Sequence, residues 1–274
     1  MLGKLLKQDF RATARVMLPV CLIALILAAF TRGCAALTKS AAATAPWRLQ
    51  NADFLSFVTN VLGVLFVISL IAVLVLAFIL MVWRFYRSFL TDEGYLMFTL
   101  PVTTAKLVLS KLIVALVWFV VSIAVVVLSC VIVGADSRVI EVFYNVEGSA
   151  PWSGGQLRAV LLSIFAFALI HETTFCLQCY ASMAIGQSHR RQKELMSVVF
   201  FFVFYIAIQI LSSIGLLTIM GMNPGVYVEK LVTPDAVYRF VQTILWSFAG
   251  VSALIAVIFC GITHRMLKRK LNLQ

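Results

Sequence analysis

The chain has 274 residues, of which 62% are hydrophobic and only 12% are charged, and its formal net charge is +11. Soluble domains carry about 45–50% apolar and about 25% charged residues, so this composition excludes a soluble domain, a disordered chain and a secreted disulfide scaffold. The composition indicates an integral membrane protein.

Residues 1–15 predict an amphipathic helix. At 100° per residue, one arc holds Leu2, Leu5, Leu6 and Phe10, and the opposite arc holds Lys4, Lys7, Arg11 and Arg15. We expect an interfacial helix with its cations at the membrane surface, where they contact lipid; a simple topological anchor is the alternative. Asp9 falls within the apolar arc, which predicts that it turns toward a protein neighbour.

Six apolar segments follow, and each is long enough to cross a bilayer core of about 30 Å as a helix. They lie near residues 16–33, 57–83, 112–134, 159–185, 196–221 and 240–263. Barrel strands are about 10 residues long and alternate in polarity, so they do not fit these runs. We predict an all-α integral membrane protein: a single transmembrane domain over 1–274 with six transmembrane helices and an uncleaved first span.

The charges orient these helices. Fifteen of the 22 lysines and arginines flank one side, before the first span, between the second and third, between the fourth and fifth, and after the sixth. The positive-inside rule therefore predicts that both termini are cytoplasmic. Because the charges lie at span ends and form no separate domain, nucleic acid is not an expected partner.

The predicted cytoplasmic loop 84–111 is unusually aromatic for its position. Thr91 is a suitable helix N-cap, Asp92 and Glu93 suit the positive end of a helix dipole, and Pro101 disfavours helix at the residue before it. We predict a short helix near 92–99, after which Thr103 caps the helix that continues into the third span. The short helix could dock into a partner's groove or rest on lipid.

The block Asp92-Glu93-Gly94-Tyr95-Leu96-Met97-Phe98-Thr99-Leu100-Pro101, with Leu109-Ser110-Lys111-Leu112 after it, resembles permease subunits of bacterial ATP-binding cassette exporters of the second permease class. These are common in Gram-positive bacteria. The opening Met1-Leu2-Gly3-Lys4-Leu5-Leu6-Lys7, with Asp9-Phe10, is similar to their amphipathic N-terminal helix. Matching residues cover roughly the first 115 positions; beyond them only the layout of six spans agrees.

This resemblance implies a type V exporter-like permease whose coupling helix docks on a separate ATPase. It assigns Asp92, Glu93, Tyr95, Leu96 and Phe98 to that interface. It also implies two ATPase subunits, which bind ATP and Mg²⁺, and a second permease, identical or related. The loop between the fifth and sixth spans is short here, so the re-entrant helices of some members are not expected.

The fourth span is the most polar. His171, Thr174, Gln178 and Ser182 share one helical stripe, and Glu172 points about 100° away. Ionisable groups at mid-membrane usually face a wet cavity or the bundle interior. His171, Glu172 and Gln178 are therefore candidates for a substrate path, with hydrogen bonding between helices as the alternative.

Several enzyme signatures are missing from the sequence. His171-Glu172 begins an H-E-x-x-H pattern, but position 175 is Phe, and the only Gly-Lys pair, Gly3-Lys4, belongs to no phosphate-binding loop. Cys176 and Cys179 match C-x-x-C inside an apolar helix, where packing is the simpler interpretation. We expect no catalytic residues, no metal site and no cofactor in this chain.

Three functions are open from the sequence. The leading hypothesis is an export permease in the bacterial cell membrane that moves peptides, drugs or lipid-like molecules while a partner hydrolyses ATP. An ion-coupled secondary transporter is the second, although its usual internal repeats are not evident. The third is a membrane protein that binds a peptide without transporting it, as an immunity or assembly factor.

Overall fold

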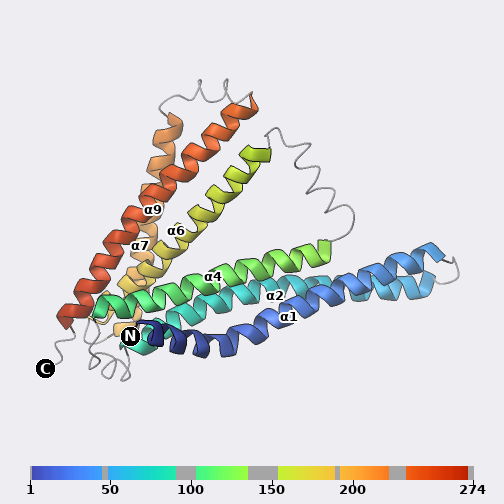
Figure 1. Ribbon diagram of the computed structural model, residues 1–274, viewed down its shortest axis with the longest axis horizontal. Helices are drawn as coiled ribbons and strands as arrows, with labels where there is room; N and C mark the ends of the chain where they lie inside the picture. Colours follow the sequence, from blue (N-terminus) through green and yellow to red (C-terminus); the bar gives the residue numbers. More distant parts are fainter. Residues whose placement is uncertain are drawn as a thin grey trace. The chain divides into compact units, whose positions relative to one another are not determined.

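The computed structural model describes residues 2–44, 49–90, 103–134, 154–188, 192–221 and 233–270. Within these ranges all regular structure is helical, and Figure 1 shows the helices labelled as follows. They are α1 (Leu2–Thr44), α2 (Leu49–Leu90), α4 (Thr104–Gly134), α6 (Gly154–Gly186), α7 (Lys193–Gly221) and α9 (Pro234–Lys270). Each predicted span lies inside one of these helices, so the prediction of an all-α chain is confirmed.

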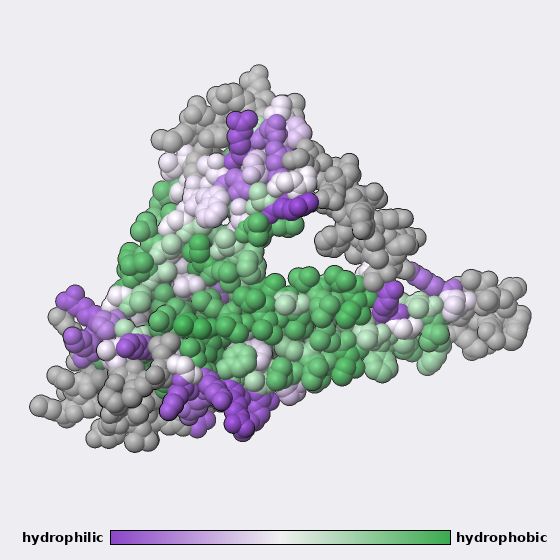
Figure 2. Space-filling model, viewed as in Figure 1, coloured by the Kyte–Doolittle hydropathy of each residue, from purple (hydrophilic) through white to green (hydrophobic). Residues whose placement is uncertain are grey.

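All six helices are long and apolar enough to cross a membrane, as expected of a multi-pass membrane protein. α1 alone has 43 residues, which corresponds to a length of about 64 Å. That is about twice the thickness of the hydrocarbon core, so the helix extends well beyond its apolar segment. Large apolar side chains lie exposed along the helices, and Figure 2 shows a largely apolar surface over α1 and α4.

Local sequence explains where two of the helices begin. The carbonyl of Thr103 accepts the amide N–H groups of Lys106 and Leu107, which places Thr103 at the start of α4 where the sequence predicts its cap. The carbonyl of Thr233 accepts the N–H groups of Ala236 and Val237 in the same way. Pro234 follows as the first residue of α9, a position where its missing N–H costs no helical hydrogen bond.

The described chain divides into two compact units. The first contains α1, α2 up to Met81 and α4 from Ile113; the second contains the last residues of α2 from Val82, the start of α4 up to Leu112, and α6, α7 and α9. The boundaries between the units therefore fall inside two continuous helices. The prediction of one transmembrane domain stays a prediction.

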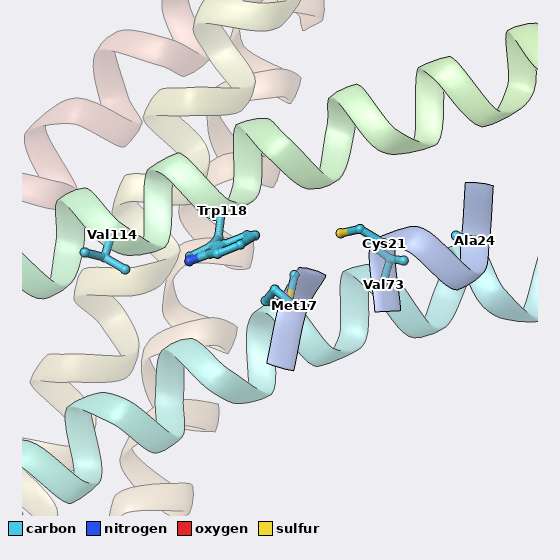
Figure 3. Close-up of a cluster of buried hydrophobic side chains, with 6 residues drawn as sticks. All are labelled: Met17, Cys21, Ala24, Val73, Val114 and Trp118. Atoms are coloured by element: carbon cyan, nitrogen blue, oxygen red, sulfur yellow. The ribbon is translucent and has the colours of Figure 1, made fainter. Parts of the chain in front are cut away.

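The first unit is built around a buried cluster drawn in Figure 3. Met17, Cys21 and Ala24 of α1 pack with Val73 of α2 and with Val114 and Trp118 of α4. Spacings of three and four residues place the α1 members on one face of that helix. α1 bends in its N-terminal part (Figure 1), and Pro19 inside the helix accounts for the bend, because it lacks the N–H that the preceding turn needs.

The second unit is organised by α6, which packs against α9 and α7. Three contacts tie α6 to α9: Gln156 donates to Asp235 Oδ1 at 2.7 Å, Ser163 to Gln242 Oε1 at 2.7 Å, and Thr174 to the Ser252 carbonyl at 2.9 Å. The paired residues differ by 79, 79 and 78 positions. Since the offset is nearly constant, the two helices run parallel in a fixed register.

The end of α6 approaches α7 closely at Gly186. A Cβ atom added to Gly186 would lie 2.5 Å from the backbone nitrogen of Ser197 and 2.6 Å from its Cα. Real Cβ atoms do not approach backbone atoms this closely, so only glycine permits the contact. The chain returns from Gly186 to Lys193, the first residue of α7, through a short connection.

We predict that Gly186→Ala destabilises the protein by about 1–3 kcal/mol, because the two helices must move apart. Thermal unfolding of the purified protein in detergent measures this. Gly155→Ala is the matched control on the same helix, since nothing lies within 4 Å of a Cβ added there. Equal stability of the two variants would contradict the assigned role of Gly186.

Candidate functional site

The segment predicted to couple to a partner joins α2 to α4. Its candidate residues Asp92, Glu93, Tyr95, Leu96 and Phe98, and the short helix near 92–99, lie outside the residues that the structure describes. The structure does describe the residues on either side of them. We call residues 84–90 the first stem and residues 103–111 the second stem.

The first stem is the C-terminal end of α2, so the helix continues seven residues past the predicted end of the span at 83. Phe85 and Phe89, four residues apart, are both buried, and Phe85 is fully so. The ring of Phe85 stacks on the ring of Tyr180 in α6, with centroids 3.9 Å apart and planes at 8°. This packing extends the helix, and the i, i+4 spacing of the phenylalanines is the sequence signal that could have indicated it.

The first stem also contacts the beginning of α7. The hydroxyl of Tyr86 donates a hydrogen bond to Oε1 of Glu194 at 3.1 Å. Glu194 lies in the first turn of α7, where a carboxylate is favoured by the helix dipole. The first stem therefore contacts both α6 and α7.

The second stem is the N-terminal start of α4, which is helical from Thr104 as the sequence predicts. Leu107, Val108, Ser110 and Lys111 are buried. The hydroxyl of Thr104 lies 3.2 Å from Nδ1 of His264 in α9, within hydrogen-bonding distance. Neither Tyr180 nor His264 stands out in the sequence, because their partners lie far away along the chain.

Both stems therefore belong to the second unit and are held by its three C-terminal helices. The contacts are an aromatic stack to α6, a hydrogen bond to α7 and a hydrogen bond to α9. A displacement of the segment between the stems would act directly on these helices.

The residues of the polar stripe of α6 differ in how deeply they are buried. Gln178 is 3% exposed, and its amide donates to the carbonyl of Phe201 in α7 at 3.2 Å. His171 is exposed, and its ring stacks on Phe167 of the same helix at 5.7 Å. The two residues share a stripe on the helical wheel but lie in different environments, because only the C-terminal half of α6 is enclosed.

Glu172 lies beside this stripe and is half-buried. The thiol of Cys176 donates to its Oε1 at a sulfur–oxygen distance of 3.7 Å. Cys176 and Cys179 are buried thiols, as their position in an apolar helix suggests. Among the described residues, no three His, Cys, Asp or Glu side chains are grouped so that they could hold a metal ion.

The basic arc of α1 lies on its outer surface. Lys4, Lys7, Arg11 and Arg15 are exposed and line a shallow hollow together with Gln8 and Ala12. Hydrophilic residues gather at the N-terminal turns of α1 in Figure 2. On the other side of the helix Asp9 is 5% exposed, so it is buried against protein as its position in the apolar arc predicts.

We predict that Phe85→Leu lowers the free energy of unfolding by about 1–2 kcal/mol, because it keeps an apolar side chain but loses the stack on Tyr180. Chemical unfolding in detergent checks the value. The neighbouring control Tyr86→Phe removes only an exposed hydrogen bond and should cost well under about 1 kcal/mol. A larger effect from Tyr86→Phe would show that the stem is held mainly by Glu194.

Comparison with known proteins identifies no relative. No family model matches the sequence, and neither the curated proteins nor the solved structures contain a match to the chain. The site therefore has to be interpreted from its own residues.

Proposed function

We propose that this chain is the membrane permease subunit of an ATP-driven exporter, with residues 92–99 as the segment that docks on the ATPase. The observation that carries this proposal is the attachment of both stems to α6, α7 and α9. A docking segment needs stems that pass its movement to the helices that line a substrate path. The loop sequence supports the same function through its resemblance to exporter permeases.

In this proposal the ATPase contacts Asp92, Glu93, Tyr95, Leu96 and Phe98. Closure of the ATPase around ATP pushes or rotates the docked segment, and the stems transmit that motion as rigid helical ends. Phe85 moves with Tyr180 because their stacked rings are fully buried. Packed interfaces of this kind shift between discrete arrangements rather than deform continuously, which suits an alternating transport cycle.

The remaining assignments follow from the same proposal. The chain lies in a bacterial cell membrane with both termini in the cytoplasm, beside a second permease that is identical or related. ATP and Mg²⁺ are bound by the ATPase subunits, and this chain contributes no catalytic group. Peptides, drugs and lipid-like molecules are the proposed cargo classes.

His171 and Glu172 are the proposed members of the substrate path. An ionisable side chain at mid-membrane costs about 2.5–3.5 kcal/mol on insertion scales, so it normally lies against water or protein rather than lipid. His171 is exposed and Glu172 is half-buried on α6, so both remain accessible to a molecule that passes along this helix. Gln178 contributes indirectly in this scheme, by holding α6 against α7.

We predict that the double variant Tyr95→Ala, Phe98→Ala loses most of its association with the ATPase subunit, because the two aromatic side chains supply the apolar contact. Co-purification of a tagged chain from its native host, followed by an ATPase assay, measures this. The control Phe202→Ala, Tyr205→Ala removes an aromatic pair of the same spacing from the exposed surface of α7. Undiminished ATPase recovery with the first variant would contradict the docking assignment.

We predict that Glu172→Gln reduces transport at least about tenfold while ATPase association stays normal, since the substitution removes the ionisable carboxyl group beside the proposed path. Export of a panel of labelled peptides, drugs and lipids from reconstituted vesicles is the measurement. Asp235→Asn serves as the control, because Asp235 is exposed in the first turn of α9 and asparagine keeps the Oδ1 that accepts from Gln156. Unchanged export at normal membrane expression would exclude Glu172 from the path.

A further inference from the structure

The four cations of α1 form a continuous stripe. Lys7, Arg11 and Arg15 are spaced by four residues, so each lies about 6 Å along the axis from the next, and Lys4 adds a fourth charge at the same face. All four are exposed. Gln8 and the small Ala12 lie beside them and complete the shallow hollow.

The opposite face of the same turns is fixed to α4. Thr13 is buried, and its hydroxyl accepts a hydrogen bond from the indole nitrogen of Trp118 at 2.8 Å. The ring of Phe10 stacks on the same indole, with centroids 5.1 Å apart and planes at 13°. Positions two apart on a helix differ by about 200°, so burial of Thr13 and Met17 turns Arg11 and Arg15 outward.

This arrangement holds like charges together. Like charges four residues apart on a helix repel one another, and a helix free to unwind could separate them. The contacts of Phe10, Thr13 and Met17 with the first unit prevent that. The four exposed side chains line one shallow hollow, so together they present a concentrated positive charge to an anion outside the protein.

The position of the stripe indicates which kind of anion binds to it. Arg15 directly precedes the first predicted span, so the stripe begins where apolar chain meets lipid headgroups. Pro19 lies inside α1, and Figure 1 shows that the N-terminal part of this helix is bent away from the axis of the rest. Cations at the membrane surface attract anionic lipids strongly, and Arg and Lys bind phosphate oxygens through charge-assisted hydrogen bonds.

We propose that Lys4, Lys7, Arg11 and Arg15, together with Gln8, form a binding site for the phosphate headgroups of anionic phospholipids. Neighbouring cations about 6 Å apart can share one phosphate between them, and the row has room for more than one headgroup. The site is preformed, because Trp118 and the buried cluster hold the helix before any lipid binds. It operates whether or not the chain couples to an ATPase.

The test uses the purified full chain in a zwitterionic detergent and follows thermal unfolding. Added phosphatidylglycerol should raise the melting temperature by several degrees, whereas phosphatidylcholine or inorganic phosphate at the same concentration should not. In Lys7→Gln, Arg11→Gln the apparent affinity for phosphatidylglycerol should fall at least about tenfold. Without lipid this variant should melt no lower than the wild type, because it removes repulsion.

The matched control is Arg265→Gln, Lys268→Gln, which removes two exposed cations three residues apart near the end of α9. This control should keep the full response to phosphatidylglycerol. An equal loss of response in both variants would overturn the proposal in favour of a general effect of net charge. Equal stabilisation by inorganic phosphate would overturn the assignment to lipid, and failure of ATPase binding would leave this result unaffected.

Discussion

The stack of Phe85 on Tyr180 is the contact on which the arrangement of the second unit depends. Both rings are fully buried, and they lie nearly parallel at 3.9 Å. Aromatic pairs of this kind stabilise by about 0.5–1.5 kcal/mol beyond the area that they bury. The contact keeps α2 helical to Leu90 and fixes where the following segment leaves the unit.

Around this contact, α6 serves as the common partner of its neighbours. Its C-terminal half is almost completely enclosed, and Gly186 allows α7 to approach its end. Hydrogen bonds to α9 recur along its length with nearly constant register. In an apolar environment such polar contacts hold helices together because no water is present as an alternative hydrogen-bond partner. Each contact nevertheless contributes only about 0.6 kcal/mol.

In the first unit, a single helix, α1, buries one face against protein and exposes its charged residues on the opposite face. α1 packs Thr13, Met17, Cys21 and Ala24 inward and leaves its cations outside. The indole of Trp118 serves both purposes, since its ring packs in the buried cluster while its nitrogen donates to Thr13. A basic stripe in a fixed orientation is the result.

Much of this protein follows from its sequence alone. Apolar runs of about 20 residues determine helices in lipid, because only a helix satisfies its own backbone there, and all six predicted spans lie in helices. Helical periodicity also separates the cations of α1 from Asp9, and the capping preference of threonine identifies Thr103 as the residue before α4. These features are local, since each depends on residues within a few turns.

Contacts between distant residues were decided only by the tertiary structure. His171 and Gln178 have the same place on a helical wheel, yet Gln178 is buried because α7 covers that part of α6 and His171 is exposed because it is not covered. Phe85 and Tyr180 are 95 positions apart, and no local pattern pairs them. The sequence determines which faces of the helices are apolar, but many partners could cover an apolar face equally well, and the tertiary structure selects one.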